Sequence, residues 1–200
     1  MIFENGTTHT KTHPTIMPPP QYYHGSVTYQ KDDKFIPVPT RNFDDYEVIG
    51  RSEDLTYFLH PCDSFGFVVD NEELAAGNLT VVPVMKLKLT AVTIGGTKLK
   101  QVSQLRIRES YSRIGVARDW YANYVRQFTG IVSDCEHLEG GKLLWQSLIK
   151  LADESADFSV SMHLLPSGEK IAAITRTTPE SDIWSNDGLN KNQVLVFQTA

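Results

Sequence analysis

The sequence predicts an α+β fold in which a mostly antiparallel central sheet carries one strand–loop–helix unit and few flanking helices. Segments with the two-residue alternation of β-strands follow one another over much of residues 64–107. Only residues 116–128 and 142–152 repeat apolar side chains with the period of an α-helix. A strand, a helix and a second strand between residues 105 and 132 make a crossover unit, in which the two strands are parallel.

Length and composition predict one domain with an N-terminal arm. The chain has 200 residues, of which 40% are hydrophobic and 22% are charged, so it can fill one core well but is too short for two generous domains. Residues 1–25 are rich in Thr, His and Pro and contain the run Pro18-Pro19-Pro20, which predicts a flexible, extended arm. The arm either lies over a partner or has no role of its own. Residues 26–200 are the predicted domain.

Charge and cysteine content exclude several classes of function. The formal net charge of -5 argues against wholesale binding to nucleic acid or to an anionic membrane, because both need clustered basic residues. No apolar run approaches the roughly 20 residues that span a bilayer, and no signal-peptide core follows Met1. Cys62 and Cys135 lack metal-ligand spacing, so we expect two reduced thiols, no metal site and a cytoplasmic protein.

The first part of the domain predicts a hairpin, and the residues that follow it match no single type of secondary structure. Val27 and Tyr29 alternate with polar residues, and Asp32-Asp33 is a turn signal, so a hairpin is predicted over residues 26–38. Residues 40–59 show no long helical period.

The middle of the chain predicts an antiparallel meander. β-Branched and aromatic residues predict strands over residues 64–70 and 79–92, and Pro83 marks a bulge or a non-central position in the second. A glycine-containing turn at residues 94–97 leads into a further strand over residues 98–107.

The last part of the chain alternates helices and strands around polar connections. The apolar stripe Val116, Trp120, Tyr124 and Phe128 predicts that the first helix packs on the sheet. The predicted elements that follow are a strand in 129–134, a helix over 142–152, strands over 157–165, 171–175 and 193–198, and a polar loop over 177–192.

The stretch from Leu105 to Phe128 contains the most informative motif. A strand-like run is followed by a polar turn and then by a helix whose first turn carries Gly115 and Ala117. A helix N-terminus presents N–H groups without intrahelical partners and the positive end of the macrodipole, so it can hold a phosphate or pyrophosphate. The small residues let an anion approach the backbone. Alternatively, they only allow the helix to pack closely on the strand.

The pattern L-x-I-x-x-x-Y-x-x-x-G-V-A resembles motif A of the GNAT superfamily of N-acetyltransferases. Leu105, Ile107, Tyr111 and the Gly115-Val116-Ala117 run match at the spacing of that family. Ser112 stands where the family usually has Gln or Arg, and the arginine is displaced by one position, to Arg113.

The resemblance implies a GNAT-like fold and a site for acetyl-CoA. Backbone N–H groups from Ser112 to Ala117 would hold the pyrophosphate, and backbone groups of the preceding strand would bind the pantetheine arm. The implied coenzyme-binding residues are Ile107, Ser112, Arg113, Ile114, Gly115, Val116 and Ala117.

Two carboxylates are candidates for the general base that the implied acetyl transfer requires. Asp134 lies at the carboxyl end of the strand after the motif helix, and Glu109 at the end of the motif strand. Alternatively, Asp134 is a cap or turn residue and Glu109 a solvated turn carboxylate. The family commonly protonates the departing thiolate with a tyrosine, and Trp145 stands at the nearest helical position here. We expect Trp145 to be a core residue and Ser133 a turn residue.

Three functional hypotheses remain. Ile131-Val-Ser-Asp and Gly140-Gly-x-x-x-Trp resemble uncharacterised acetyltransferase-like proteins of bacteriophages, which implies a product made in the host cytoplasm. The first hypothesis is an N-acetyltransferase that uses acetyl-CoA and acts on a protein or a small amine. The second is a catalytically inactive protein of the same fold that binds and inhibits a host protein. The third is a β-rich structural protein without a cleft. A homodimer is left open.

Overall fold

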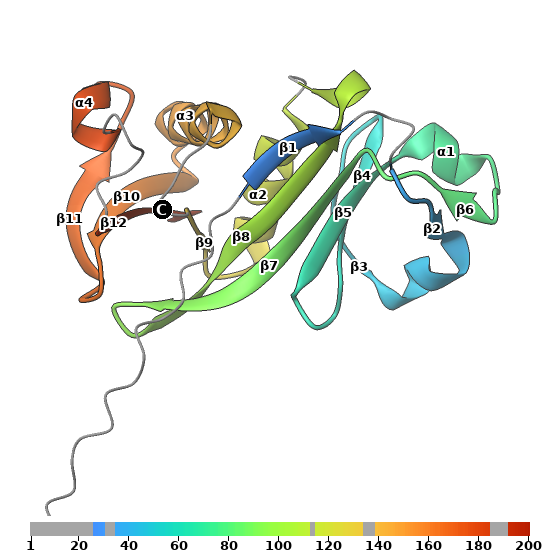
Figure 1. Cartoon of the computed structure of the whole chain (residues 1–200), viewed down its shortest axis with the longest axis horizontal. Helices are drawn as coiled ribbons and strands as arrows, with labels where there is room; N and C mark the ends of the chain where they lie inside the picture. The colour runs from blue at the N-terminus through green and yellow to red at the C-terminus, as the bar shows by residue number, and fades with distance from the viewer. Residues whose placement is uncertain (1–25, 31–34, 113–114, 134–138, 185–191) are drawn as a thin grey trace, which may run out of the picture.

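The computed structural model describes residues 26–30, 35–112, 115–133, 139–184 and 192–200. Within these residues the chain is an α+β protein built on a large, curled and mostly antiparallel sheet with four α-helices (Figure 1). The strands are β1 (Ser26–Gln30), β2 (Val38–Pro39), β3 (Glu47–Arg51), β4 (Leu55–Leu59), β5 (Phe65–Asp70), β6 (Thr80–Val81), β7 (Met85–Ile94), β8 (Thr97–Arg108), β9 (Ile131–Val132), β10 (Phe158–Leu164), β11 (Glu169–Ile174) and β12 (Gln193–Thr199). The helices are α1 (Asn71–Ala75), α2 (Val116–Gln127), α3 (Glu139–Glu154) and α4 (Glu180–Ile183), with 3-10 turns η2 (Thr40–Asp45) and η3 (Glu109–Tyr111).

The main sheet has the strand order β11-β10-β12-β9-β8-β7-β5-β4-β3, and β1 is paired to β8 beside this path. Neighbouring strands are antiparallel except at two places, where β9 and β1 each run parallel to β8. Strands β2 and β6 form a separate antiparallel pair. The predicted crossover from strand to helix to parallel strand is therefore confirmed for β8, α2 and β9.

The two long helices cover one face of the sheet. Phe197 pairs with Val160 on one neighbouring strand and with Ile131 on the other, so the three side chains share a face. All three belong to the largest core, which also contains the buried stripes of α2 and α3. On the opposite face of β4 and β5, Phe58 and Phe67 form a smaller core beneath η2 and α1. The sheet thus presents one continuous apolar face to α2 and α3.

Helix α2 is fixed to the sheet by its aromatic stripe. Trp120 is fully buried, stacks on Tyr124 with ring centroids 5.2 Å apart, and donates from Nε1 to the carbonyl oxygen of Phe58 at 3.3 Å. The Tyr124 hydroxyl donates to Oδ1 of Asp63 at 3.0 Å, and Lys100 Nζ lies 3.0 Å from Oδ2 of the same carboxylate. These contacts confirm the amphipathic helix that the sequence predicts.

The predicted strands are confirmed for most of the sheet. The turn at residues 94–97 joins β7 to β8 through Gly95 and Gly96, both with positive φ. Pro83 falls in the gap between β6 and β7, so the strand predicted over residues 79–92 is divided there. No α-helix lies within residues 40–59, where the described chain instead forms η2, β3 and β4.

Three predictions about local structure are wrong. The hairpin over residues 26–38 does not form: β1 pairs in parallel with β8, and Phe35 and Ile36 are not in a strand. The loop predicted over residues 177–192 contains α4, which buries Ile183 in the main core. Helix α3 begins at Glu139, before the predicted residue 142, and includes both glycines at 140 and 141.

None of the helices in the described ranges is long and apolar enough to cross a membrane. The same ranges contain no group of three or more His, Cys, Asp or Glu residues placed to hold a metal ion. Cys62 is an exposed free thiol, and Cys135 lies outside the described residues.

Replacing Gly66 by Ala tests how closely α2 packs on β5. A Cβ at this position would lie 2.6 Å from Cζ2 of Trp120, which is held in the core. We expect the substitution to lower the free energy of unfolding by about 1–3 kcal/mol. An unobstructed strand position would give the opposite sign, since Ala is favoured over Gly by about 0.5–1 kcal/mol. Urea denaturation measures the change.

A double-mutant cycle with Trp120→Phe provides the control, because Phe removes the ring atoms nearest to the new Cβ. The cost of Gly66→Ala should be smaller in the Phe background. An equal cost in both backgrounds would show that contact with Trp120 is not its cause.

Candidate functional site

The site is built around a change of partner along one edge of β8. Strand β9 pairs with β8 only at Lys100 and Gln101, whereas β1 pairs with it from Gln104 to Arg108. Between these two segments lies a bulge: Gln104 pairs with Lys88 of β7 and Val102 with the next residue of β7, so Ser103 has no register partner there. A bulge bends and twists a strand. Strand β8 therefore parts from β9 just before the motif residues begin.

Ser133 holds β9 where its short ladder ends. Its N–H donates to the carbonyl oxygen of Leu195 at 2.8 Å, and its hydroxyl oxygen accepts from the N–H of Leu195 at 2.9 Å. Its carbonyl oxygen accepts from Nε2 of the buried Gln101 at 3.0 Å. With its hydroxyl oxygen and its backbone groups all bonded inside the protein, Ser133 extends the contact between β9 and β12 and does not form the turn that the sequence predicts.

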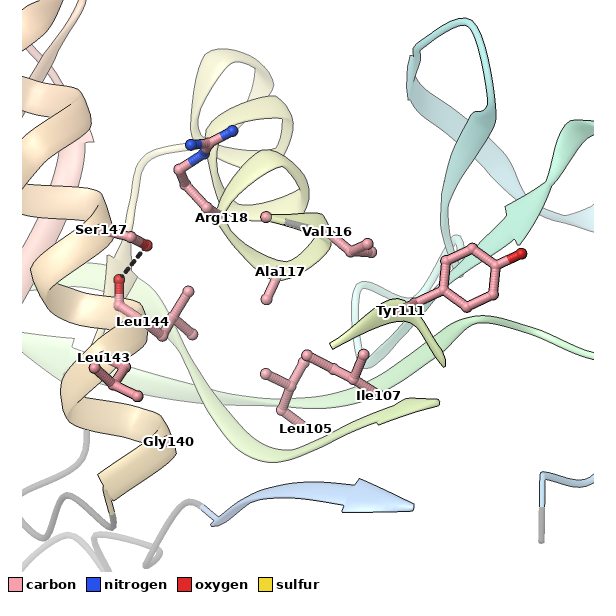
Figure 2. A pocket seen from close by; sticks show the side chains of 11 residues that line it. Leu105, Ile107, Tyr111, Val116, Ala117, Arg118, Gly140, Leu143, Leu144 and Ser147 are labelled. Carbon is pink, nitrogen blue, oxygen red and sulfur yellow. Dashed lines mark hydrogen bonds between the residues drawn. The ribbon is translucent and has the colours of Figure 1, made fainter. Parts of the chain in front are cut away.

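A cavity of about 220 Å³ lies where β8, α2 and α3 meet (Figure 2). Its floor comes from β8, and its walls come from the start of α2 and the first turns of α3. Most of the lining is apolar, and its residues are Leu105, Ile107, Tyr111, Gly115, Val116, Ala117, Arg118, Gly140, Leu143, Leu144 and Ser147.

The N-terminus of α2 opens on this cavity without a side-chain cap. Gly115 is the N-cap residue and has φ 83°, a left-handed conformation that glycine adopts without strain. Its carbonyl oxygen accepts the first helical hydrogen bond, from the N–H of Asp119 at 3.0 Å. The N–H groups of the three residues between them have no partner within the helix. They give this end of the cavity a positive potential.

Arg118 adds a cation to the same end of the cavity. Its guanidinium is held by Asp119, with Nη2 2.7 Å and Nε 2.8 Å from Oδ1. The Arg118 side chain remains 41% exposed. A Cβ built on Gly115 would lie 3.0 Å from Nη2 of Arg118, so the guanidinium sits directly against the N-cap. An anion at the helix start would therefore meet both backbone N–H groups and a fixed arginine.

Tyr111 fixes the turn that precedes α2. Its hydroxyl points away from the cavity (Figure 2) and donates to Oδ2 of Asp70 at 2.7 Å. The other oxygen of Asp70 accepts from the N–H of Glu72 and so caps α1. Arg108 lies over the Tyr111 ring at 5.3 Å and pairs with Glu73 at 3.2 Å. The end of β8 and η3 are thus held against α1.

Four of the predicted coenzyme-binding residues line the cavity: Ile107, Gly115, Val116 and Ala117. Ser112 lies outside the lining, and its N–H donates to the carbonyl oxygen of Glu109 at 3.1 Å. Glu109 itself is exposed at the start of η3 and is also absent from the lining. Arg113, Ile114 and Asp134 lie outside the described residues.

Sequence reasoning missed Arg118 and the wall that α3 provides. Arg118 follows the motif directly, so the basic residue in the first turn of the helix was the available signal. Leu143 is 56% exposed although it is a large apolar residue, and it lies beside the apolar stripe that the helical period predicts. A large apolar residue outside the buried stripe of a helix can indicate that the residue lines a cavity.

No hydroxyl group among the described lining residues is free to give a proton to a bound ligand. Among the described lining residues, the hydroxyl of Tyr111 is bonded to Asp70 and that of Ser147 donates to the carbonyl oxygen of Leu144 at 2.6 Å. Trp145 is only 3% exposed and packs edge-on against Tyr121, with ring centroids 6.4 Å apart. As predicted, Trp145 is a core residue. The arrangement suits anion binding and apolar contact more clearly than acid catalysis.

Comparison of this chain with protein-family models, with curated protein sequences and with solved structures gives no significant match.

Replacing Tyr111 by Phe tests the anchor beneath the site. Burial, followed by the hydrogen bond to Asp70, raises the pKa of Tyr111 from 10.0 to about 12. The neutral phenol therefore stabilises the folded state below pH 10.0, and this contribution is lost as the pH rises towards 12. We expect Tyr111→Phe to lower the free energy of unfolding by about 1 kcal/mol at neutral pH.

The stability difference between the two proteins should narrow as the pH rises above 10.0, because only the parent has this group to ionise. Urea denaturation over a pH series measures this stability difference. The contributions of the other tyrosines are the same in both proteins and cancel in the difference. A difference that stays constant up to pH 12 would contradict the role given to the Tyr111 phenol.

Proposed function

We propose that this protein is an N-acetyltransferase of the GNAT type that uses acetyl-CoA. The observation that carries the proposal is the uncapped N-terminus of α2, which has a left-handed Gly115 at its start and opens on an apolar cavity beside β8. The same residues carry the motif A resemblance. A pyrophosphate needs convergent N–H groups and close approach to the backbone, and an acyl chain needs apolar walls.

The coenzyme would bind in two parts. The pyrophosphate would accept hydrogen bonds from the N–H groups of Val116 and Ala117, with Arg118 beside it as a counter-charge. The pantetheine arm would then follow β8 past Ile107 and Leu105, which supply the apolar floor. This course leads the thioester along the line where β8 and β9 part.

Acetyl transfer would require few catalytic groups. The neutral amine attacks the acetyl carbon, the new C–N bond forms as the C–S bond breaks, and a base takes the amine proton while the thiolate leaves. Glu109 is exposed where β8 ends, at the pyrophosphate end of this course, and is therefore the weaker of the two candidate bases. Asp134 is the other candidate from its place in the sequence. The thiolate would take its proton from solvent, since both lining hydroxyls already donate elsewhere.

The same lack of a donor favours a second candidate function. A protein that binds coenzyme A without transferring the acetyl group, and that acts by binding and inhibiting a host protein, needs the anion site but no acid. The buried position of Trp145 and the bonded hydroxyls of Tyr111 and Ser147 are compatible with it. Coenzyme affinity and turnover separate the two functions.

Gly115→Val should abolish coenzyme A binding. The substitution places a β-branched side chain where φ is 83° and where the Cβ would press on Arg118, so both the backbone cradle and the guanidinium must move. Isothermal titration calorimetry with coenzyme A measures the loss.

Gly96→Val is the matched control. Gly96 has φ 82° in the turn between β7 and β8, and a Cβ there meets nothing within 4 Å. Its backbone strain is therefore similar to that at Gly115, without contact to the cavity. Equal coenzyme affinities in the two variants would exclude the α2 N-terminus as the pyrophosphate site.

Replacing each candidate base tests the chemical step. Glu109→Gln and Asp134→Asn keep the shape of the side chain and remove the charge, so the variant that lacks the true base should lose about 10²–10⁴-fold in turnover. Acetylation of a panel of amines and of host lysate proteins is compared with coenzyme A affinity in each variant. A loss of turnover with intact affinity identifies the base. A parent protein that binds coenzyme A but acetylates nothing in the panel supports the second function.

A further inference from the structure

We propose that β1 is an autoinhibitory strand, which occupies the segment of the β8 edge that the pantetheine arm of acyl-CoA needs and which must leave before the coenzyme can bind. This inference rests on the proposed function, because it concerns access to the same site. It assigns residues 26–30 a regulatory role that the motif itself does not suggest.

The first support is the register of β1. Five consecutive residues, Ser26 to Gln30, pair in parallel with Gln104 to Arg108 of β8. An extended ligand that carries amide groups would make its hydrogen bonds with the same exposed edge, because strand β9 pairs with β8 only as far as Gln101. The two occupants exclude each other, since each backbone N–H and C=O on that edge has one outward direction.

The second support is the position of the cavity. Its floor residues Leu105 and Ile107 are the register partners of Val27 and Tyr29, so β1 runs parallel to the segment of β8 that forms the floor (Figure 2). The cavity of about 220 Å³ is smaller than the roughly 300–1,000 Å³ of ordinary ligand pockets. The edge of β8 next to this floor, where the arm could make backbone hydrogen bonds, is the edge that β1 occupies.

The third support is the way in which β1 is attached. It pairs with β8 alone among the described strands, so its departure breaks no second ladder. The next described residues of the chain are anchored separately: Phe35 is buried, and the carbonyl oxygen of Ile36 accepts from Nζ of Lys86 at 2.6 Å. The strand can therefore leave the edge while the chain after it keeps its place.

An equilibrium between closed and open edges lowers the apparent affinity for the coenzyme by the fraction of molecules that are open. Minor states of folded proteins are typically populated at about 0.1–10%. If the open state holds about 1–10% of the molecules, coenzyme A binds about 10–100-fold more weakly than it would to a permanently open edge. A strand that only completes the sheet would give no such penalty.

Proline substitutions in the full chain test the inference. Proline cannot donate a ladder hydrogen bond, and successive residues of a strand direct their N–H groups alternately to its two sides, so either Val27→Pro or Thr28→Pro removes a bond to β8. We expect at least one of these variants to bind coenzyme A about 10-fold or more tightly than the parent in calorimetric titration. Thr12→Pro, the same chemical change in the N-terminal arm, should leave the affinity unchanged. If neither strand variant gains affinity, the inference is wrong.

Hydrogen exchange in the unaltered chain gives an independent readout that requires no variant to fold. Saturating coenzyme A should increase exchange in residues 26–30 while it protects amides near the start of α2. Bound coenzyme with unchanged protection in residues 26–30 would overturn the inference and leave the proposed function intact. If coenzyme A binds neither the parent nor any variant, the proposed function fails and the inference fails with it.

Discussion

The bulge at Ser103 changes the direction and twist of β8, and the position of the candidate site depends on this change. Before the bulge, β8 holds β9 at Lys100 and Gln101; after it, the same edge faces β1. The hydroxyl of Ser103 donates to the carbonyl oxygen of Lys88 at 3.3 Å and so satisfies part of the interrupted ladder. Because a bulge adds twist, the second half of β8 turns away from β9 and brings the start of α2 over Leu105 and Ile107.

Two anchors keep α2 in place over this twisted strand. At one end, the contact between Tyr111 and Asp70 joins the turn before the helix to the cap of α1. Towards the other end, Tyr124 bonds to Asp63, which also pairs with Lys100 where β9 begins. The described contacts thus hold η3 before the helix and the C-terminal half of α2, while no side chain caps the N-terminus. An anion site benefits from donors of fixed position, because donors that move freely lose conformational entropy when the anion binds.

The sequence predicted the parts of the fold in which local pattern and tertiary environment agree. The apolar residues through Trp120 and Tyr124 recur with a helical period, and their side chains are buried together. The two glycines after Ile94 have positive φ and form the predicted turn. The partner of β1 could not be predicted, because the residues of a strand do not specify which distant strand will pair with it. Helix α4 was missed because four residues show no period; it is held by the burial of Ile183 and by the bonds from Lys142 and Gln146 to Glu180. Gly115 was found as a motif residue, but only the structure shows its left-handed φ and that an added Cβ would press on Arg118.

Strand β1 precedes every other described strand, yet its partner β8 follows many elements later. Because synthesis proceeds from the N-terminus, residues 26–30 have been synthesised before the residues of β8. An open strand edge with apolar residues such as Leu105 and Ile107 invites pairing with other chains. Because β1 pairs with that edge, the edge is closed to strands of other chains, and a ligand that displaced β1 would have to cover the same backbone groups.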